Sequence, residues 1–283
     1  MPRWSLVLLP ALLCLGTAAH AQVVPFRASA PFAPMPPMPA APAASAAGQP
    51  DSDPLAWRGR MTASLSATSG NSRTRAAQVN ADISRRKEGG KTTLTAVVTE
   101  SQAGSKPVRQ TTAGRWAGTA QHDRDVDADL FAFARMAVEH DRVIDLQLRW
   151  QAALGLGRHV INEADRTLDL FAGLGRTVSR YSQEKTIGGE TDSRFASNSI
   201  LIGNEFTDQL TPTVSFKQRL ESYLSIDGDR NHLFKFSAAL NVDMTRTLAL
   251  TVALTDSYNS RVAAGQRRND LALTTGLSVK IGP

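Results

Sequence analysis

The chain has 283 residues, a formal net charge of +6 and one cysteine, Cys14, which lies in an apolar N-terminal segment. The rest of the chain can therefore form neither a disulfide nor a thiolate metal site. Its cations are scattered singly among acidic residues, with no aromatic platform between them. This distribution argues against nucleic acid, the partner that a basic chain usually suggests.

Residues 1–21 have the pattern of a secretory signal peptide. Arg3 supplies a positive charge, residues 6–13 are almost wholly apolar, and Ala19-His20-Ala21 forms a small-x-small cleavage site. The apolar run is shorter than the roughly 20 residues that span a bilayer as a helix. Cys14 follows a leucine rather than a small residue, which argues against lipidation. We predict an exported protein.

Residues 22–55 form a different kind of segment. Nine of the 14 prolines fall between residues 23 and 54, interleaved with alanine. Proline removes a backbone donor and fixes φ, so neither helix nor sheet extends through such a segment. We predict a disordered periplasmic leader that is an inert linker; a periplasmic spacer or a ligand for a partner protein is the alternative. Residues 56–283 form the predicted folded domain.

Apolar and polar residues alternate in about twelve segments of this domain, which is the pattern of β-strands. In the clearest of them, residues 144–157, Leu148 and Leu154 share one parity, while Gln147 and Arg149 share the other. The predicted strands span 57–68, 74–86, 91–102, 108–120, 127–139, 143–158, 166–180, 195–207, 212–226, 232–243, 246–259 and 268–281. The apolar side faces either a packed core or lipid; in the second case the polar side lines a wet lumen.

Strand length and composition favour the lipid-facing alternative. Several segments run about 12–16 residues, which suits a tilted membrane strand better than a sandwich strand. Their polar faces are rich in Gly, Ala, Ser and Thr. With both termini in the periplasm, odd-numbered connections face outward and are longer; the seventh, 181–194, is the longest, whereas the eighth and tenth are tight. We predict an all-β fold, an antiparallel transmembrane β-barrel of about twelve strands. The aromatic content of 6% predicts thin interfacial girdles.

Several short motifs lie along this domain: Trp57-x-Gly59, Ser69-Gly70-Asn71-Ser72, Asp145 with Leu148-Arg149, Gly155-Leu156-Gly157, Gly203-Asn204-Glu205, Asn269-Asp270 and Thr275-Gly276-Leu277-Ser278-Val279-Lys280. In their order and spacing they resemble the salt-induced outer-membrane proteins of the YdiY type, a family with a domain of unknown function. The resemblance covers roughly residues 57–281. It implies an outer-membrane location and no assigned catalytic residue; the ending Ile281-Gly282-Pro283 departs from the aromatic ending common in such barrels.

No motif for catalysis or metal binding stands out. The histidines beyond the signal form no metal-ligand pair, and nothing marks Ser222 or Ser257 as a nucleophile. Alternate aspartates in residues 123–129 suggest calcium, but the sharp-turn glycine and the distal bidentate glutamate are missing, which favours a solvated turn. We predict no enzyme activity, no metal and no cofactor; an outer-membrane hydrolase is the weakest alternative.

The polar faces supply candidates for the lining of a lumen. We predict either a narrow passive channel for small solutes or an envelope component in osmotic or salt stress, with a closed structural barrel as the alternative. Because both charge signs occur, no strong anion preference is expected. The predicted lumen-lining residues are Gln147, Arg149, Glu205, Lys217, Arg219, Glu221, Lys235, Asp270 and Lys280.

The expected partners are outer-membrane lipid and the barrel-assembly machinery, and the chain is expected to be a monomer. A further group of cations lies in the predicted outward loops. We expect plain solvation of these side chains; pairing with lipopolysaccharide phosphates through charge-assisted hydrogen bonds is the alternative. These cations are Arg73, Arg75, Lys106, Arg109, Arg261, Arg267 and Arg268.

Overall fold

The computed structural model describes residues 56–68, 74–87, 89–105, 108–227, 232–260, 262 and 268–282. The predicted signal peptide and leader, residues 1–55, lie outside the described residues. In the part that is described, no helix has the length and apolar character needed to cross a bilayer.

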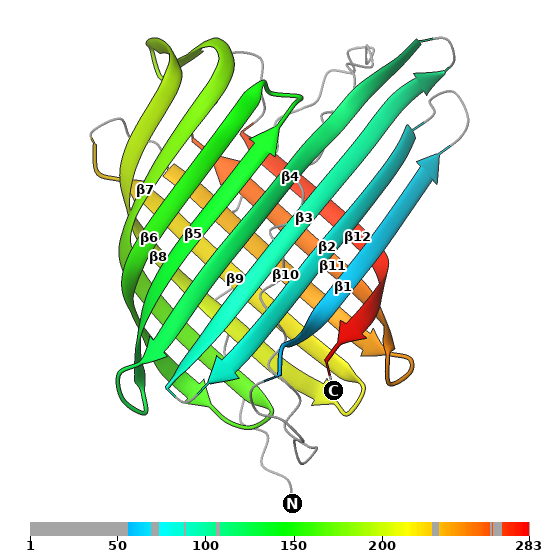
Figure 1. Ribbon diagram of the computed structural model, residues 1–283, viewed down its shortest axis with the longest axis vertical. Helices are drawn as coiled ribbons and strands as arrows, with labels where there is room; N and C mark the ends of the chain where they lie inside the picture. Colours follow the sequence, from blue (N-terminus) through cyan, green and yellow to red (C-terminus); the bar gives the residue numbers. More distant parts are fainter. Residues whose placement is uncertain are drawn as a thin grey trace, which may run out of the picture. The chain divides into compact units, whose positions relative to one another are not determined.

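The described residues form twelve antiparallel strands, each hydrogen-bonded to the next, and β12 pairs with β1 to close a barrel (Figure 1). This confirms the predicted fold class. The strands are β1 Arg58–Thr68, β2 Thr74–Lys87, β3 Gly90–Ser105, β4 Val108–Asp125, β5 Leu130–Asp141, β6 Leu146–Asn162, β7 Arg166–Ile187, β8 Glu190–Thr211, β9 Val214–Ser225, β10 His232–Asp243, β11 Leu248–Asn259 and β12 Asn269–Ile281.

The largest difference from the sequence-based strands lies at residues 181–194. The long loop expected there is a continuation of β7 and β8, joined by a two-residue turn at Gly188 and Gly189. Both glycines have positive φ, 65° and 95°, as tight hairpin turns require. Most side chains of this extension are exposed on both faces, so its sequence shows no apolar alternation. The signal used to find strands is therefore absent here.

The outer face of the barrel is apolar. Leucines near the middle of their strands point outward, and Leu154, Leu174 and Leu273 are 66%, 65% and 71% exposed. Polar side chains such as Glu221 and Ser278 are instead fully buried. A soluble sandwich buries its apolar faces, whereas a membrane barrel turns them outward to lipid. The side-chain distribution is that of a transmembrane β-barrel.

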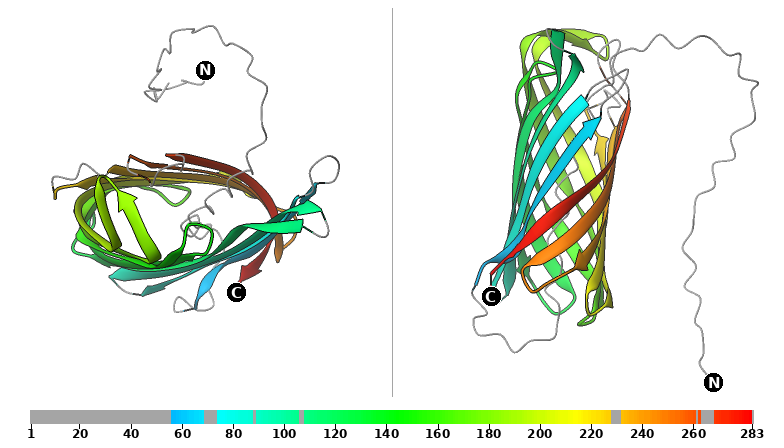
Figure 2. Two further views of the ribbon diagram at one scale, coloured as in Figure 1. Left: turned by 90° about the horizontal axis from the view of Figure 1, so that it is seen from above. Right: turned by 90° about the vertical axis from the view of Figure 1, so that its right-hand side faces the viewer.

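The interior is packed differently on its two sides. Small hydroxyl and amide side chains of β10, β11, β12 and β1 form a hydrogen-bonded row: Asn241 to Thr251 at 2.8 Å, Thr251 to Ser278 at 2.7 Å and Ser278 to Thr62 at 2.7 Å. Larger aromatic and charged side chains fill the side formed by β5 to β9. Seen along its axis, the ring of strands is flattened rather than round (Figure 2, left).

The closing junction is the shortest in the described part of the barrel. β1 and β12 are joined by five residue pairs, from Gly59 opposite Ile281 to Ala63 opposite Leu277. The pairing of β1 with β2 contains 11 pairs and that of β7 with β8 contains 18. All five pairs lie near the end of the barrel where β1 begins and β12 ends, which is called the terminus end below (Figure 1).

Candidate functional site in the barrel interior

A cluster of apolar side chains occupies the interior between β5 and β9. The rings of Phe133 and Phe171 meet edge to face, with centroids 5.7 Å apart. Glycines on the neighbouring strands make room for these rings, because a Cβ on Gly157 would overlap Phe131 and one on Gly203 would overlap Phe171. The buried members of this aromatic cluster are Phe131, Phe133, Ala153, Phe171, Leu201 and Tyr223.

A network of buried ion pairs crosses the interior beside the aromatic cluster. Arg135 on β5 pairs with Glu221 on β9, although three strands separate them along the wall. Arg219 contacts Glu221 and Glu205, each at 2.6 Å, and Lys217 contacts Glu205 at 2.9 Å. Each carboxylate thus has two cationic partners, as a buried charge requires. These five residues are called the central network below.

Other polar groups attach to the central network. The Tyr223 hydroxyl donates to Glu221 at 3.1 Å, and the Gln121 side-chain oxygen accepts from Arg219 at 3.3 Å. The Lys235 ammonium lies 5.4 Å from the Tyr223 ring centroid, a cation–π contact. Because Gln121 belongs to β4 and Arg219 to β9, their bond is a second link across the interior.

Two further charge groups lie nearer the ends of the barrel. Toward the end opposite the termini, Glu139 pairs with Arg115 at 2.9 Å and Arg149 at 3.4 Å, and Arg149 also donates to Ser179 at 2.9 Å. At the terminus end, Asp243 pairs with Lys280 and, at 3.5 Å, with Arg60. With the central network, these groups carry charge along the length of the interior.

The residues predicted to line the lumen lie in several different parts of the barrel. Glu205, Lys217, Arg219 and Glu221 come together in the central network, with Lys235 beside it. Arg149 and Lys280 belong to the two end groups, and Asp270 lies opposite Ser257 near the start of β12.

Gln147 differs from the expectation, because the alternation of β6 breaks at this residue. The pairing of β6 with β7 shifts register between Leu146 and Leu148, which leaves Gln147 as an additional residue. Leu146, expected on the outer face, is fully buried, and Gln147 is exposed. A β-bulge of this kind reverses the inside–outside pattern on one side of it.

The sequence analysis missed several members of the interior. Arg115, Gln121, Arg135 and Glu139 supply partners to the predicted charges, yet they were not among the candidates. A signal for β5 existed, since Phe131, Phe133, Arg135 and Glu139 share one parity. The face of β5 that these residues form contains both aromatic and charged side chains. It therefore has the pattern of neither a lipid-facing nor a purely polar face.

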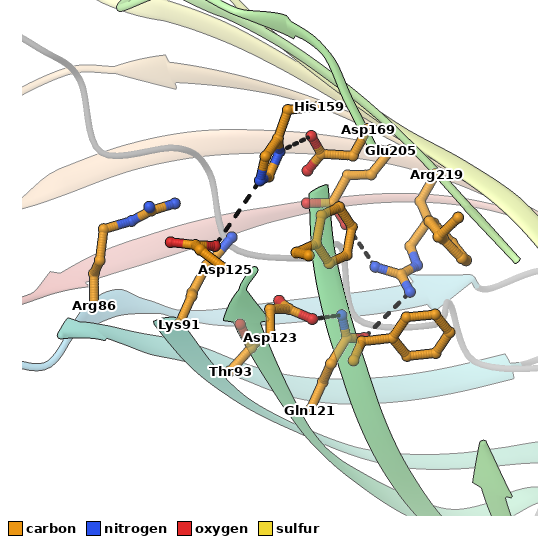
Figure 3. Close-up of a pocket in the computed structure, with 13 residues that line it drawn as sticks. Arg86, Lys91, Thr93, Gln121, Asp123, Asp125, His159, Asp169, Glu205 and Arg219 are labelled. Carbon is orange, nitrogen blue, oxygen red and sulfur yellow. Dashed lines mark hydrogen bonds and ion pairs between the residues drawn. The ribbon is translucent and has the colours of Figure 1, made fainter. Parts of the chain in front are cut away.

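A cavity of about 50 Å³ opens below the aromatic cluster at the terminus end (Figure 3). His159 hydrogen-bonds Asp169 at 2.7 Å, lies 3.9 Å from Asp125 and stacks on Phe131 with centroids 4.8 Å apart. The residues lining the cavity are Arg86, Lys91, Thr93, Gln121, Asp123, Asp125, Phe131, Phe133, His159, Asp169, Phe171, Glu205 and Arg219.

The groups considered for catalysis and metal binding are dispersed. Among the described residues, no three His, Cys, Asp or Glu side chains are placed to hold a metal ion. Asp123 and Asp125 lie on β4, and Asp127 caps the following turn by accepting the N–H groups of Asp129 and Leu130 at 2.9 and 2.8 Å. These bonds lower the pKa of the Asp127 carboxyl below its usual value.

Most of the cations considered for lipopolysaccharide lie outside the described residues. Arg73, Lys106, Arg261 and Arg267 belong to this group, as does the side chain of Arg109. Arg75, in β2, and Arg268, just before β12, both lie near the end of the barrel opposite the termini.

An antiparallel membrane barrel with a charged, partly filled interior is the class of protein that this architecture defines. Within that class, the chain belongs to DUF481, a family of proteins of unknown function, which matches residues 61–281. This confirms the sequence-based resemblance as far as a family of unknown function. A search among curated proteins finds no match.

Several solved barrel structures are similar to this chain at low sequence identity. The NanC porin is 12% identical, with a TM-score of 0.47 over 78% of this chain and 100% of its own. The translocator domain of the autotransporter NalP from Neisseria meningitidis is 8% identical, with a TM-score of 0.46 over 80% of this chain and 88% of its own. The β domain of the Bordetella autotransporter BrkA is 11% identical, with a TM-score of 0.37 over 79% of this chain and 97% of its own.

Proposed function

We propose that this chain is an exported outer-membrane barrel that provides a narrow passive pathway for small polar solutes. The apolar outer face supports insertion in a bilayer, since Leu154, Leu174 and Leu273 would otherwise be exposed to water. Residues 1–21 would direct export, and residues 22–55 would remain in the periplasm as a spacer. In this arrangement the terminus end faces the periplasm.

The observation that carries the proposal is the distribution of interior charge. The group around Glu139, the central network and the group around Asp243 follow one another along the interior. Charged side chains inside a membrane barrel provide solvation for polar solutes that lipid cannot provide. The aromatic cluster, where the rings of Phe133 and Phe171 meet, fills part of this interior. Small solutes, rather than large ones, are therefore the proposed cargo.

The two signs of charge limit the selectivity of this pathway. Both carboxylates of the central network have cationic partners, so much of the local field is cancelled. We propose weak ion selectivity, in which Arg149 and Arg219 affect conductance mainly by position and size. The remaining lumen candidates, including Lys235 and Asp270, would contribute to the wall.

A closed structural barrel is the second candidate, and one observation favours it. The central network and the aromatic cluster bridge the interior at the same level, through contacts between β5 and β9. A barrel of this kind would support the envelope without transport. A role in salt or osmotic stress fits either candidate and would appear as a growth defect of a deletion strain at high salt.

Planar-bilayer recording of the refolded protein tests the channel. The wild type is expected to give small discrete conductance steps, and Phe133→Ala larger ones because the variant removes a buried ring from the interior. Leu156→Ala, on the outer face, is the matched control and should leave the steps unchanged. If neither the wild type nor Phe133→Ala conducts, the channel is wrong and the closed barrel stands.

A further inference from the structure

The cavity at the terminus end has two chemically different walls. Arg86 and Lys91, from the hairpin of β2 and β3, form a cationic wall. Asp125, His159 and Asp169, from β4, β6 and β7, form an acidic wall with an imidazole between its carboxylates (Figure 3). The cavity therefore carries both signs of charge, and Asp123 of β4 also lines it beside Lys91.

The cationic wall holds two like charges side by side. Arg86 and Lys91 lie directly opposite each other in the pairing of β2 with β3. Like charges at such a cross-strand position repel each other and destabilise the hairpin. Neither side chain makes a close ion pair or hydrogen bond with another residue of the described ranges, although Asp123, which also lines the cavity, lies directly opposite Lys91 in the pairing of β3 with β4. A bound anionic group between them would relieve the repulsion and use their free donors.

The acidic wall is held in place and keeps acceptor capacity. His159 is fixed by its bond to Asp169 at 2.7 Å and by its stacking on Phe131. The carboxylate of Asp125 has only the 3.9 Å approach of His159 as a side-chain partner among the described residues. Its oxygens can therefore accept hydrogen bonds from a bound ammonium group.

The size of the cavity limits the ligand to a small molecule. Its volume of about 50 Å³ exceeds that of a single water site, for which roughly 10–15 Å³ is enough. A simple anion would be attracted by Arg86 and Lys91 and repelled by Asp125. A simple cation would be attracted by Asp125 and repelled by Arg86 and Lys91. A ligand that carries both charges satisfies both walls.

We propose that this cavity binds a small zwitterion of amino-acid size. The carboxylate of the ligand lies between Arg86 and Lys91, and its ammonium group faces Asp125. This makes the cavity the first binding position of the pathway at the terminus end. Only that transport role rests on the proposed function, because binding itself needs no open pathway.

Isothermal titration of the full chain in detergent micelles tests the ligand class. Glycine is the zwitterionic probe, acetate the anionic probe and methylammonium the cationic probe. Glycine is expected to bind, and each single-charge probe to bind about tenfold more weakly, because it loses one charge-assisted contact. No binding of glycine, or equal affinity for acetate or methylammonium, overturns the proposal.

Substitutions separate the two walls. Lys91→Gln and Asp125→Asn are each expected to weaken glycine binding about tenfold, by removing one charged contact. Arg158→Gln is the matched control: its side chain is 70% exposed toward the terminus end and lies outside the cavity lining. An equal loss in Arg158→Gln, or no loss in either wall variant, overturns the site. Arg86→Gln replaces Lys91→Gln if the latter fails to refold.

The outcomes distinguish this inference from the proposed channel. Glycine binding without conductance in bilayers would leave the site in place and contradict the channel alone. Conductance without glycine binding would contradict the site alone.

Discussion

Phe131 lies directly opposite Gly157 in the pairing of β5 with β6, and its ring occupies the space where a side chain at residue 157 would begin. The packing of the Phe131 ring in the interior therefore depends on the absence of a side chain at residue 157 of β6. A glycine in a strand costs backbone entropy, and here that cost is offset by an aromatic ring packed on bare backbone.

Gly157→Ala is expected to destabilise the barrel by about 1–3 kcal/mol, because the added methyl group overlaps the Phe131 ring and forces it to move. Urea unfolding of the protein in liposomes measures the change. Gly118→Ala is the control, since a Cβ there would lie 3.7 Å from the nearest Val138 atom, an ordinary contact. Equal effects of the two substitutions would contradict the packing argument.

Glu221→Gln is expected to cost about 3–5 kcal/mol, because it leaves the cations of Arg135 and Arg219 facing a neutral amide in a buried position. The same unfolding experiment measures it. Glu100→Gln serves as the control: its ion pair with Arg142 is exposed and is expected to contribute at most about 1 kcal/mol. A loss below that of the control would show that the central network contributes little stability.

Leu154→Arg is expected to cost about 2–4 kcal/mol, since the residue lies midway along β6 on the outer face and is therefore expected near the bilayer centre. Leu210→Arg, at the end of β8, should cost about 0–1 kcal/mol because it lies near the interface. Equilibrium unfolding in liposomes compares the two. If both substitutions cost nothing and the protein stays soluble without detergent, the membrane assignment is wrong.

Thr62→Cys with Ser278→Cys is expected to form a disulfide across the β1–β12 junction, because the two hydroxyl oxygens lie 2.7 Å apart. The only native cysteine is Cys14, so the background is clear once the predicted signal peptide is removed. A disulfide there should stabilise the closed barrel by about 2–4 kcal/mol. Non-reducing gels detect the bond. Ser66→Cys with Thr274→Cys lies beyond the paired part of the junction and should cross-link poorly; equal cross-linking would contradict the short junction.

The strands were largely predictable because a lipid-facing strand must alternate, as β12 does from Leu271 to Ile281. Where that constraint ends, prediction failed: the hairpin around Gly188 is exposed on both faces, and the bulge at Gln147 shifts the parity of β6. Such changes follow from backbone pairing rather than from the local sequence pattern.

The interior was predictable only in part. Charged residues on a polar face, such as Lys217 and Arg219, could be recognised from parity alone. Their partners could not, because contacts such as Arg135 with Glu221 join residues 86 positions apart and depend on barrel diameter and register. The parity of a residue within its strand predicts whether its side chain points inward. It does not predict which side chains of other strands that residue contacts.

The brevity of the β1–β12 junction also determines how the molecule comes apart. Five pairs hold the two ends of the described sheet together, and at least 11 hold the β1–β2, β9–β10 and β11–β12 neighbours. Heat or denaturant should therefore break ring closure before it separates any hairpin, leaving a curved open ribbon as the first species on the unfolding route. The same five pairs are expected to be the last to form when the cylinder closes.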